Sequence, residues 1–510
     1  MPTPSPRASG ETRYVGNDRL LFGIIFGVLA FWLFAQTTLN ISPVMAQDLG
    51  IETGVMNIAV SITALFSGIF IVVVGSLADR FGRVKVVQAG FVLSIAGSLL
   101  VGLAPQGSLA PVFLMLGRIL QGLSGAFIMS ASLALLKAYW EGAARQRAVS
   151  LWSIGSWGGS GFAALFGGLM AENVGWRWIF FAAAALSLLG MFMVAGTPES
   201  KAEAKGAYKF DTAGVLTFMV MMVSLQVFAT QGGTLGWTSL PTLGLLAASV
   251  VFAVLFFRVE SSNPDGFVDF KLFRNMTFTG ATISNFLLNA TAGILIVAMM
   301  LVQLGGGMTA QEAGFLTLGY AIAIVAFIRV GEKLLQRFGP RRPMIWGSLI
   351  VGAAIACLLP TNVMLGDYKI LAIVGFTLFG LGLAFYATPS TDAALSALPD
   401  DQAGSGAGIY KMASSLGASF GVAISATVFT ALSDSDRSVG WTEGVISYMG
   451  RQDNLAVREA ALFALAINLL MVVAAIISIA MTIPKTQRSD GAVSLDADAA
   501  ANDLAAVRRS

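Results

Sequence analysis

Histidine is absent from the 510 residues of this chain, and cysteine occurs once, as Cys357. The missing histidine excludes His-based proton relays and His-ligated metal or haem sites. A single cysteine within an apolar run excludes a disulfide framework and argues against redox chemistry. Charge is also scarce, because only 12% of the residues are Asp, Glu, Lys or Arg, whereas soluble domains carry about 25%. The chain is therefore not an ordinary soluble protein.

Apolar residues take the place of the missing charges. They make up 56% of the chain, and the mean hydropathy is +0.77. Apolar runs of about 20 residues, the length that a helix needs to cross the hydrocarbon core, recur along the sequence. Strands of a membrane barrel would instead alternate apolar and polar residues. We therefore predict an all-α integral membrane protein.

The apolar runs, read in order, predict fourteen membrane spans. These lie near residues 20–44, 53–77, 84–104, 111–136, 147–171, 176–196, 212–231, 238–258, 275–303, 311–330, 343–360, 369–397, 404–432 and 459–484. With both termini cytoplasmic, this arrangement places most of the 31 Lys and Arg in cytoplasmic segments, as the positive-inside rule requires. We therefore expect a multi-pass protein of the cytoplasmic membrane with both termini cytoplasmic and residues 433–458 external.

Two related polar loops interrupt the apolar runs. The first is GSLADRFGRVK at residues 75–85, between spans 2 and 3, and the second is GEKLLQRFGPRR at residues 331–342, between spans 10 and 11. Aligning their shared Arg-Phe-Gly places Gln336 where the first loop has Asp79. The loops occupy equivalent positions in two six-span halves if spans 7 and 8 are an insert. A parallel repeat around a central cavity is the plan of a secondary transporter.

The repeat predicts five segments. They are a cytoplasmic N-terminal segment (1–19), an N-terminal six-helix half (20–197), a linker with a two-helix insert (198–265), a C-terminal six-helix half (266–485) and a disordered cytoplasmic tail (486–510). Spans 7 and 8 of the insert have almost no polar residues, so we expect them to pack toward lipid.

Several motifs resemble those of the major facilitator superfamily. The 75–85 loop resembles the superfamily's signature loop, and Leu114-x-x-x-Arg118-x-x-Gln121-Gly122 in span 4 resembles its proton-antiporter motif. Fourteen spans are typical of its drug:proton antiporter branch with two extra central helices. Longer segments are similar to quinolone and multidrug efflux proteins of the NorB type, namely FWLFAQ (31–36), NIAVSITALFSG (57–68), WSIGSWGGSG (152–161), RVGEKLLQ (329–336), ATPSTD (387–392) and AGIYKMASSLG (407–417). The resemblance implies proton-coupled efflux by alternating access, driven by the proton motive force without a cofactor.

Two positions depart from the pattern of this branch. Many fourteen-span antiporters have an Asp in span 1 where this chain has Ala35-Gln36, and the Gly-Pro of the span-5 motif is replaced by Ala163-Ala164. The first departure removes a usual site of protonation, and the second removes a helix kink.

The first polar loop is expected to form a cytoplasmic gate. An acid at the position of Asp79 can cap a neighbouring helix or pair with an Arg across the seam between the halves, and such contacts favour the outward-facing state. The alternative is that Arg80, Arg83 and Lys85 only anchor the topology. The expected gate residues of both loops are Gly75, Asp79, Arg80, Gly82, Arg83, Arg329, Glu332 and Arg337.

Two charged residues within spans are candidates for proton coupling, because charge inside a membrane is costly and often functional. Arg118 in span 4 would exchange partners as a nearby group gains or loses a proton; alternatively, it is a structural Arg held by backbone carbonyls. Asp392, three residues after Pro389 in span 12, would bind a proton in a partly desolvated cavity; alternatively, it is an acid at a helix end.

Other polar and aromatic residues within spans are candidates for substrate binding. They are Phe31, Trp32, Gln36, Gln121, Asn285, Asn289 and Gln303. The alternative for the amides is hydrogen bonding between helices, and the aromatic residues can equally serve packing. The expected partners are small amphiphilic substrates, protons and membrane lipids, with no nucleic acid, and the protein is expected to be a monomer.

Three functions compete at this stage. The first is proton-coupled efflux of amphiphilic drugs such as quinolones, and the second is export or flipping of a physiological lipid or other amphiphile with incidental drug transport. The third, a membrane enzyme or receptor, is disfavoured because the sequence has no Ser-His-Asp set, metal cluster or phosphate loop. The segment GSGAG at 404–408 lacks a histidine partner and is interpreted as the flexible start of a span.

Overall fold

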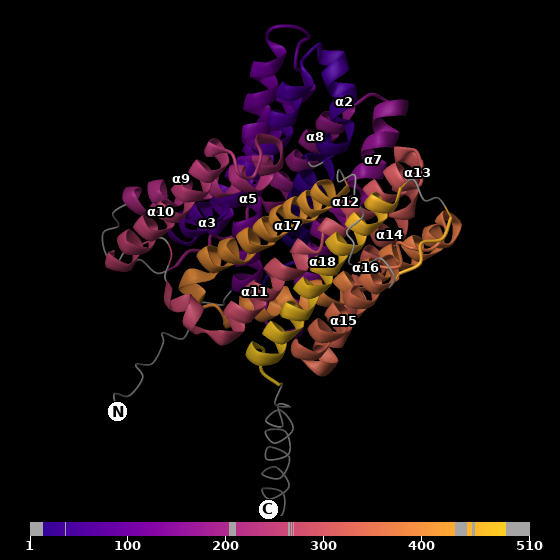
Figure 1. The fold of residues 1–510 in the computed structure, drawn as a ribbon. Helices are drawn as coiled ribbons and strands as arrows, with labels where there is room; N and C mark the ends of the chain where they lie inside the picture. The colour runs from indigo at the N-terminus through magenta and orange to yellow at the C-terminus, as the bar shows by residue number, and fades with distance from the viewer. Residues whose placement is uncertain are drawn as a thin grey trace, which may run out of the picture.

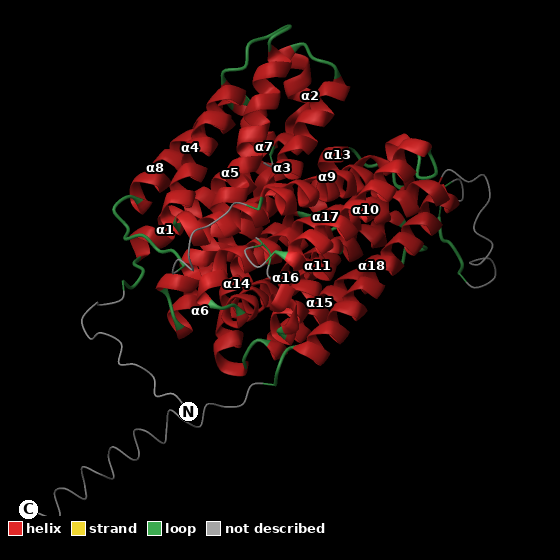
Figure 2. Cartoon of the chain, turned by 90° about the vertical axis from the view of Figure 1, so that its left-hand side faces the viewer, coloured by secondary structure: helices red, strands yellow, loops and turns green. Residues whose placement is uncertain are grey.

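Helices make up the architecture of this protein, as seen in a computed structural model (Figure 2). The structure describes residues 14–35, 37–202, 211–263, 266, 268, 270–433, 446–450 and 454–485, and none of these residues forms a strand. Thirteen of the helical segments are long and apolar enough to cross a membrane. The prediction of an all-α membrane protein is confirmed. Gln36, the expected C-terminal tail and most of the loop at 433–458 lie outside the described residues.

The N-terminal bundle comprises the helices up to residue 194. Its elements are α1 (Asp18–Leu29), the π-helical η1 (Ala30–Ala35), α2 (Thr38–Leu49), α3 (Thr53–Phe81), α4 (Arg83–Gly102), α5 (Ala110–Tyr139), α6 (Gly142–Ser153), the π-helical η2 (Ile154–Gly158), α7 (Gly159–Asn173) and α8 (Arg177–Val194). Predicted span 1 corresponds to α1, η1 and α2. Predicted span 5 corresponds to α6, η2 and α7, a glycine-rich segment that is not among the thirteen more apolar ones.

The remaining helices form the insert and the C-terminal bundle. The insert consists of α9 (Thr212–Leu235) and α10 (Leu240–Ser262). The C-terminal bundle contains the short 3-10 helices η3 (Phe270–Arg274) and η5 (Asp400–Gln402), the π-helical η4 (Leu301–Gly305), and α11 (Met276–Ala290), α12 (Gly293–Met300), α13 (Ala310–Leu316), α14 (Leu318–Phe338), α15 (Arg341–Leu358), α16 (Leu365–Ala397), α17 (Ala403–Ser433) and α18 (Leu455–Thr482).

The two bundles share one pattern of helix packing. In the N-terminal bundle, α5 packs on α3 and α4, and α8 packs on α1 and α4. In the C-terminal bundle, α16 packs on α14 and α15, and α18 packs on α11 and α15. Each of these four pairings occurs at equivalent spans of the two bundles. This equivalence agrees with the repeat expected from the two polar loops.

The seam between the bundles is formed by a few long helices. The helix α17 packs on α3 and α5 (Figure 1), whereas α14 and α16 pack on α6. Glycines allow the close approach of α3 and α17: a Cβ atom added at Gly75 would lie 2.3 Å from the carbonyl oxygen of Gly404, and one added at Gly408 would lie 2.6 Å from that of Ile71. Residues 404–408 form the buried first turns of α17, so the prediction that a span starts here is confirmed, while its flexibility stays a prediction. The insert helix α9 covers the seam at α3 and α17.

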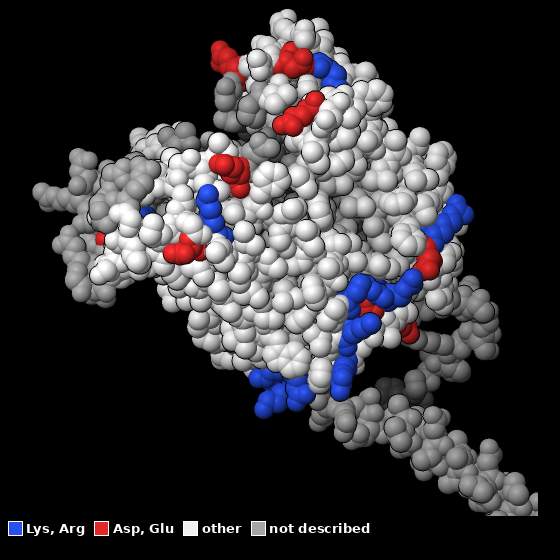
Figure 3. Space-filling model, turned by 90° about the vertical axis from the view of Figure 1, so that its right-hand side faces the viewer, with Lys and Arg blue, Asp and Glu red and all other residues white. Residues whose placement is uncertain are grey.

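The start of α1 and the end of α18 lie on one face of the molecule, since Asp18 pairs with Arg147 of α6 and Pro484 lines a groove together with Gln146 of α6. We call this the terminal face. It carries the loop that joins α3 to α4 and the start of α17, so the seam contacts at Gly75 lie close to it. Figure 3 shows one side of the molecule, where basic side chains gather toward the lower part and a broad uncharged surface lies above them. This distribution is the one expected of a protein with an apolar belt and a basic face.

Candidate functional site

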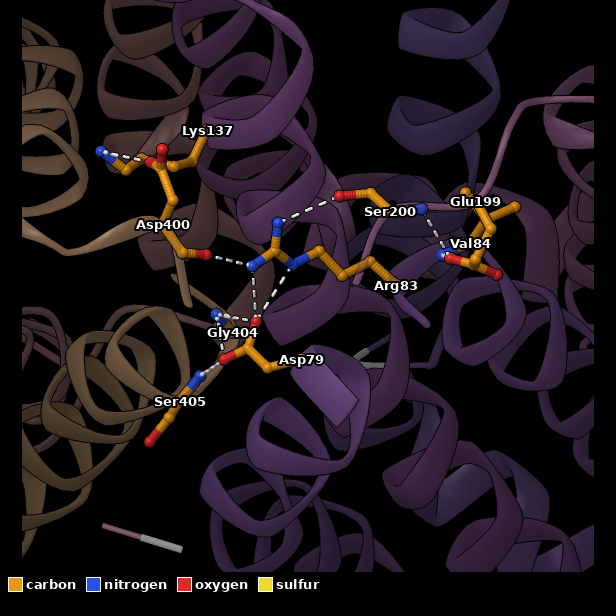
Figure 4. A network of polar contacts seen from close by, with 9 residues as sticks. All are labelled: Asp79, Arg83, Val84, Lys137, Glu199, Ser200, Asp400, Gly404 and Ser405. Carbon is orange, nitrogen blue, oxygen red and sulfur yellow. Dashed lines mark hydrogen bonds and ion pairs between the residues drawn. The ribbon is translucent and has the colours of Figure 1, made fainter. Parts of the chain in front are cut away.

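Asp79 connects the N-terminal bundle to the start of α17 (Figure 4). Its two carboxylate oxygens accept hydrogen bonds from the backbone N–H groups of Gly404, both at 2.9 Å, and of Ser405 at 3.0 Å. Asp79 therefore caps a helix of the other bundle, where free N–H groups and the positive end of the helix dipole favour an anion. The side chain is buried, so this capping contact is shielded from water.

Arg83 completes the same network from the first turn of α4. Its Nε and Nη2 atoms donate to Oδ1 of Asp79 at 3.0 and 2.8 Å, and Nη2 also donates to the carbonyl oxygen of Asp400 at 2.6 Å. Lys137 of α5 reaches the Asp400 carboxylate at 3.5 Å. Contacts to Gly404, Ser405 and Asp400 all cross the seam. We call Asp79, Arg83, Asp400, Gly404 and Ser405 the seam latch.

The segment after α8 binds the turn between α3 and α4, which carries the seam latch. Gly82, at φ +121°, adopts a conformation that favours glycine, and it separates α3 from α4. The first N–H groups of α4, those of Val84 and Lys85, donate to the carboxylate of Glu199 at 2.9 and 3.1 Å. Ser200 accepts from Nη1 of Arg83 at 3.1 Å. The start of the predicted linker thus belongs to the latch network.

A second ion pair crosses the seam between α6 and α16. Arg145 Nε donates to Oδ1 of Asp392 at 3.0 Å, and Gln146 Nε2 donates to Oδ2 at 3.4 Å. Arg145 also donates to the hydroxyl of Ser396 at 2.6 Å. Asp392 is buried, yet it lines a groove together with Gln336. The predicted coupling acid is therefore salt-bridged to the opposite bundle.

The second polar loop makes different contacts from the first. Arg329 and Gln336 both donate to the carboxylate of Glu332, and all three residues belong to α14. Arg337 lies over the ring of Phe338, with 5.2 Å between Cζ and the ring centroid. These contacts join neighbours in the sequence, whereas Asp79 also binds Gly404 and Ser405 across the seam. Gln336 stands where the first loop has its acid.

Arg118 is buried inside the N-terminal bundle and bound mainly by backbone carbonyls. Its Nη1 donates to the carbonyl of Ala35 at 2.7 Å and to the side-chain oxygen of Gln121 at 2.8 Å, and its Nε donates to the carbonyl of Ala59 at 3.1 Å. No carboxylate pairs with it among the described residues. This geometry matches the structural alternative, and the coupling role of Arg118 stays a prediction.

Two of the predicted amide residues, Asn285 and Gln121, bind other helices in this structure. Asn285 Nδ2 donates to the carbonyl of Tyr410 at 2.9 Å and to the Ser414 hydroxyl at 2.6 Å, joining α11 to α17. Asn289 donates to Asn285 within α11. Gln121 donates to Ser98 at 3.2 Å. The contacts of Asn285 and Gln121 correspond to the alternative of hydrogen bonding between helices, whereas that of Asn289 stays within α11.

The aromatic candidates divide into two groups. Phe31 is buried against Gly125 of α5, so it serves packing. Trp32 of η1 and Trp152 of α6 instead lie beside Lys411 of α17, whose Nζ is 5.8 Å from the Trp32 ring centroid and 5.0 Å from that of Trp152. Gln303 lies half-buried in η4.

Several residues of these networks were not singled out from the sequence. They are Arg145, Gln146, Asp400, Gly404, Ser405, Glu199 and Lys411. The only available signal was for Lys411, a charge near the edge of a predicted span. Among the described residues, no group of three or more His, Cys, Asp or Glu could hold a metal ion.

Comparisons with known proteins agree on one family. The family model described as Major Facilitator Superfamily matches residues 20–422 and 277–495. The quinolone resistance protein NorB of Staphylococcus aureus strain MRSA252 is 47% identical over 84% of this chain and 91% of its own length, and NorB of strain Newman is 47% identical over 82% and 90%. Among solved structures, the proton:xylose symporter XylE superposes with a TM-score of 0.62 at 15% identity, covering 92% of this chain and 96% of that one. The resemblance inferred from the motifs is confirmed.

Proposed function

This chain belongs to the major facilitator superfamily, and from that premise we propose that it exports amphiphilic drugs such as quinolones in exchange for protons. The observation that carries the proposal is the 47% identity to quinolone resistance proteins over most of both chains. Membership of this superfamily supports a transporter, and we propose no enzymatic activity. The driving force would be the proton motive force, with no bound cofactor.

Transport would proceed by alternating access of two halves. We assign residues 20–197 and 266–485 to these halves and residues 198–265 to the linker and insert, with the terminal face and both termini in the cytoplasm. The matching helix pairings of the two bundles support this division. In this conformation the halves would be closed on the cytoplasmic side, because the latch contacts near the terminal face cross the seam.

The seam latch would set the relative stability of the outward-facing state. Opening the cytoplasmic side must separate Asp79 from the N-terminus of α17 and Arg83 from Asp400. Each lost charged hydrogen bond costs about 1.5–3 kcal/mol. A latch with a free energy of this magnitude favours the outward-facing state but leaves the inward-facing state accessible, as a transport cycle requires.

Asp392 would couple proton binding to the opening of the seam, with Arg118 as the fixed positive charge of the N-terminal half. An ionised Asp392 holds Arg145 across the seam, so the pair stabilises the closed cytoplasmic side. Protonation would remove the charge attraction and weaken this contact. A proton that arrives from outside would therefore favour the inward-facing state and leave into the cytoplasm. That direction is opposite to drug export, as antiport demands.

The other predicted gate and substrate residues would act around these two contacts. Gly75 and Gly82 allow the close approach and the turn of the latch, and Arg329, Glu332 and Arg337 form the weaker copy of the gate. The substrates would be small amphiphiles that enter from the cytoplasm or the lipid. We propose that a monomer carries out the cycle, since each chain has both halves.

A susceptibility profile tests the proposed function. The chain is expressed in an efflux-deficient bacterial host, and minimal inhibitory concentrations are measured for quinolones and for unrelated amphiphiles. We expect raised quinolone resistance that collapses when a protonophore is added and that Asp79→Asn lowers at equal membrane abundance. Unchanged resistance to every drug, together with movement of labelled lipid between leaflets, would contradict the proposal and favour the lipid exporter.

A further inference from the structure

Lys411 is a buried ammonium group without an acidic partner. Its side chain enters the seam from α17, the residue is only 7% exposed, and its Nζ lies 5.0 Å from the Trp152 ring centroid and 5.8 Å from that of Trp32. Every other described basic residue that is buried has an oxygen partner: Arg83 binds Asp79, while Arg118 and Arg458 bind backbone carbonyls. No hydrogen bond or ion pair joins Lys411 to another described residue.

Burying a cation without a counter-charge lowers the stability of the protein. Removing an ammonium group from water costs several kcal/mol. Two indole faces within about 6 Å return roughly 2 kcal/mol or more for a desolvated pair. The part of the desolvation cost that the indoles do not offset could be offset by an anion that binds beside Lys411. The site is therefore better satisfied with an anion than without one.

A second unsatisfied donor belongs to the same site. The indole Nε1 of Trp32 is buried and has no hydrogen-bond partner among the described residues, although buried polar groups are almost always paired. Trp32 belongs to η1, and Trp152 lies in the last turn of α6, just before η2; these two π-helical segments contact each other. Single π-helical turns occur frequently at functional sites.

We propose that Lys411, Trp32 and Trp152 form a binding site for the carboxylate of a planar aromatic substrate, an inference that rests on the proposed function and names the substrate class of its transport site. The Lys411 ammonium and the Trp32 N–H are donors for the carboxylate, and the two indoles offer apolar faces for an attached ring. A permanently cationic drug would meet like charge here.

The site also responds to the transport cycle. Lys411 comes from the C-terminal bundle, whereas both tryptophans come from the N-terminal bundle. In this structure the ammonium lies against the indoles and the seam is closed beside it, since Gly408 touches α3. Separation of the bundles on the cytoplasmic side would move Lys411 away from the indoles and open room for the substrate between them.

The test compares a quinolone carboxylic acid with its ethyl ester, which keeps the rings and loses the anion. Dissociation constants of both are measured on the purified full-length protein by equilibrium binding at pH 7.5, for wild type and for Lys411→Gln, Lys411→Arg and Trp32→Phe. We expect wild type to bind the acid about 10- to 150-fold tighter than the ester, the range that a charge-assisted hydrogen bond contributes. Lys411→Gln should reduce this ratio to near one, while Lys411→Arg should retain most of it.

Trp32→Phe, which keeps an aromatic ring and removes the N–H, should lower the ratio by about 3- to 10-fold. An acid-to-ester ratio near one in wild type, or a wild-type ratio that persists in Lys411→Gln, would overturn the carboxylate site. Because the readout is a ratio for folded protein, a general loss of stability does not imitate the expected result. Failure of the proposed function is seen separately, as the absence of resistance in the host assay.

Discussion

Asp79→Asn is the sharpest perturbation of the seam latch, because it changes charge and not size. Asparagine is as good a helix cap as aspartate, so one hydrogen bond to the start of α17 can survive. The change removes the charge at the helix N-terminus, worth about 0.3–2 kcal/mol, and turns charge-assisted bonds into neutral ones, at about 1 kcal/mol or more. The closed cytoplasmic side should lose about 2–3 kcal/mol in total, and so the ratio of open to closed molecules should rise about 30- to 150-fold.

Distance measurements between spin labels can read this ratio directly. Suitable label positions are Ala143, exposed in the first turn of α6, and Met276, 58% exposed in the first turn of α11, both introduced as cysteines in a protein without Cys357. The variant should gain a population with longer distances than wild type. Asp367→Asn serves as the control, because Asp367 is an exposed acid in the first turn of α16. The reasoning is refuted if Asp79→Asn leaves the distance distribution as it is in wild type.

Three further substitutions probe the packing of the seam and the buried charges. Gly75→Ala should slow transport, since its Cβ would lie 2.3 Å from a backbone oxygen of α17, whereas Gly366→Ala meets no atom within 4 Å and should not; equal rates would contradict this. Arg118→Ala should lose both uphill export and exchange and lower the unfolding temperature in detergent, because each buried acceptor left unpaired costs about 1–3 kcal/mol. Asp392→Asn should abolish proton-driven export but retain downhill exchange. The double variant Arg145→Asp with Asp392→Arg, which reverses the ion pair, would restore export only if the two residues act purely as a latch.

The spans were predictable because hydropathy is a local property of the sequence. Helix α17 runs from Ala403 to Ser433 and was expected at 404–432, and α9 begins at Thr212 as expected. The π-helical segments η1 and η2 were not predictable, since they interrupt the helices without proline. The polar loop could be located for the same local reason, by its charges between two apolar runs.

The partners of the site residues required the fold. Asp79 and Gly404 are separated by 325 positions. Almost every residue has a backbone N–H group, so the sequence does not show which of them binds an acid. The same holds for Arg118, whose carbonyl partners could belong to any residue. Lys411 was passed over because its charge stands near a span edge, where bases usually anchor topology. Only the burial of Lys411 against two tryptophans distinguishes it.

Proton-for-drug exchange by the purified protein in liposomes tests the central claim most directly. Liposomes that contain the protein are prepared with an interior more acidic than the outside solution. Quinolone accumulation and internal pH are recorded together. The account predicts that quinolone accumulates against its gradient while the internal pH rises, and that Asp392→Asn does neither. Quinolone accumulation that does not depend on the pH gradient, or no accumulation when the gradient is present, would contradict the account.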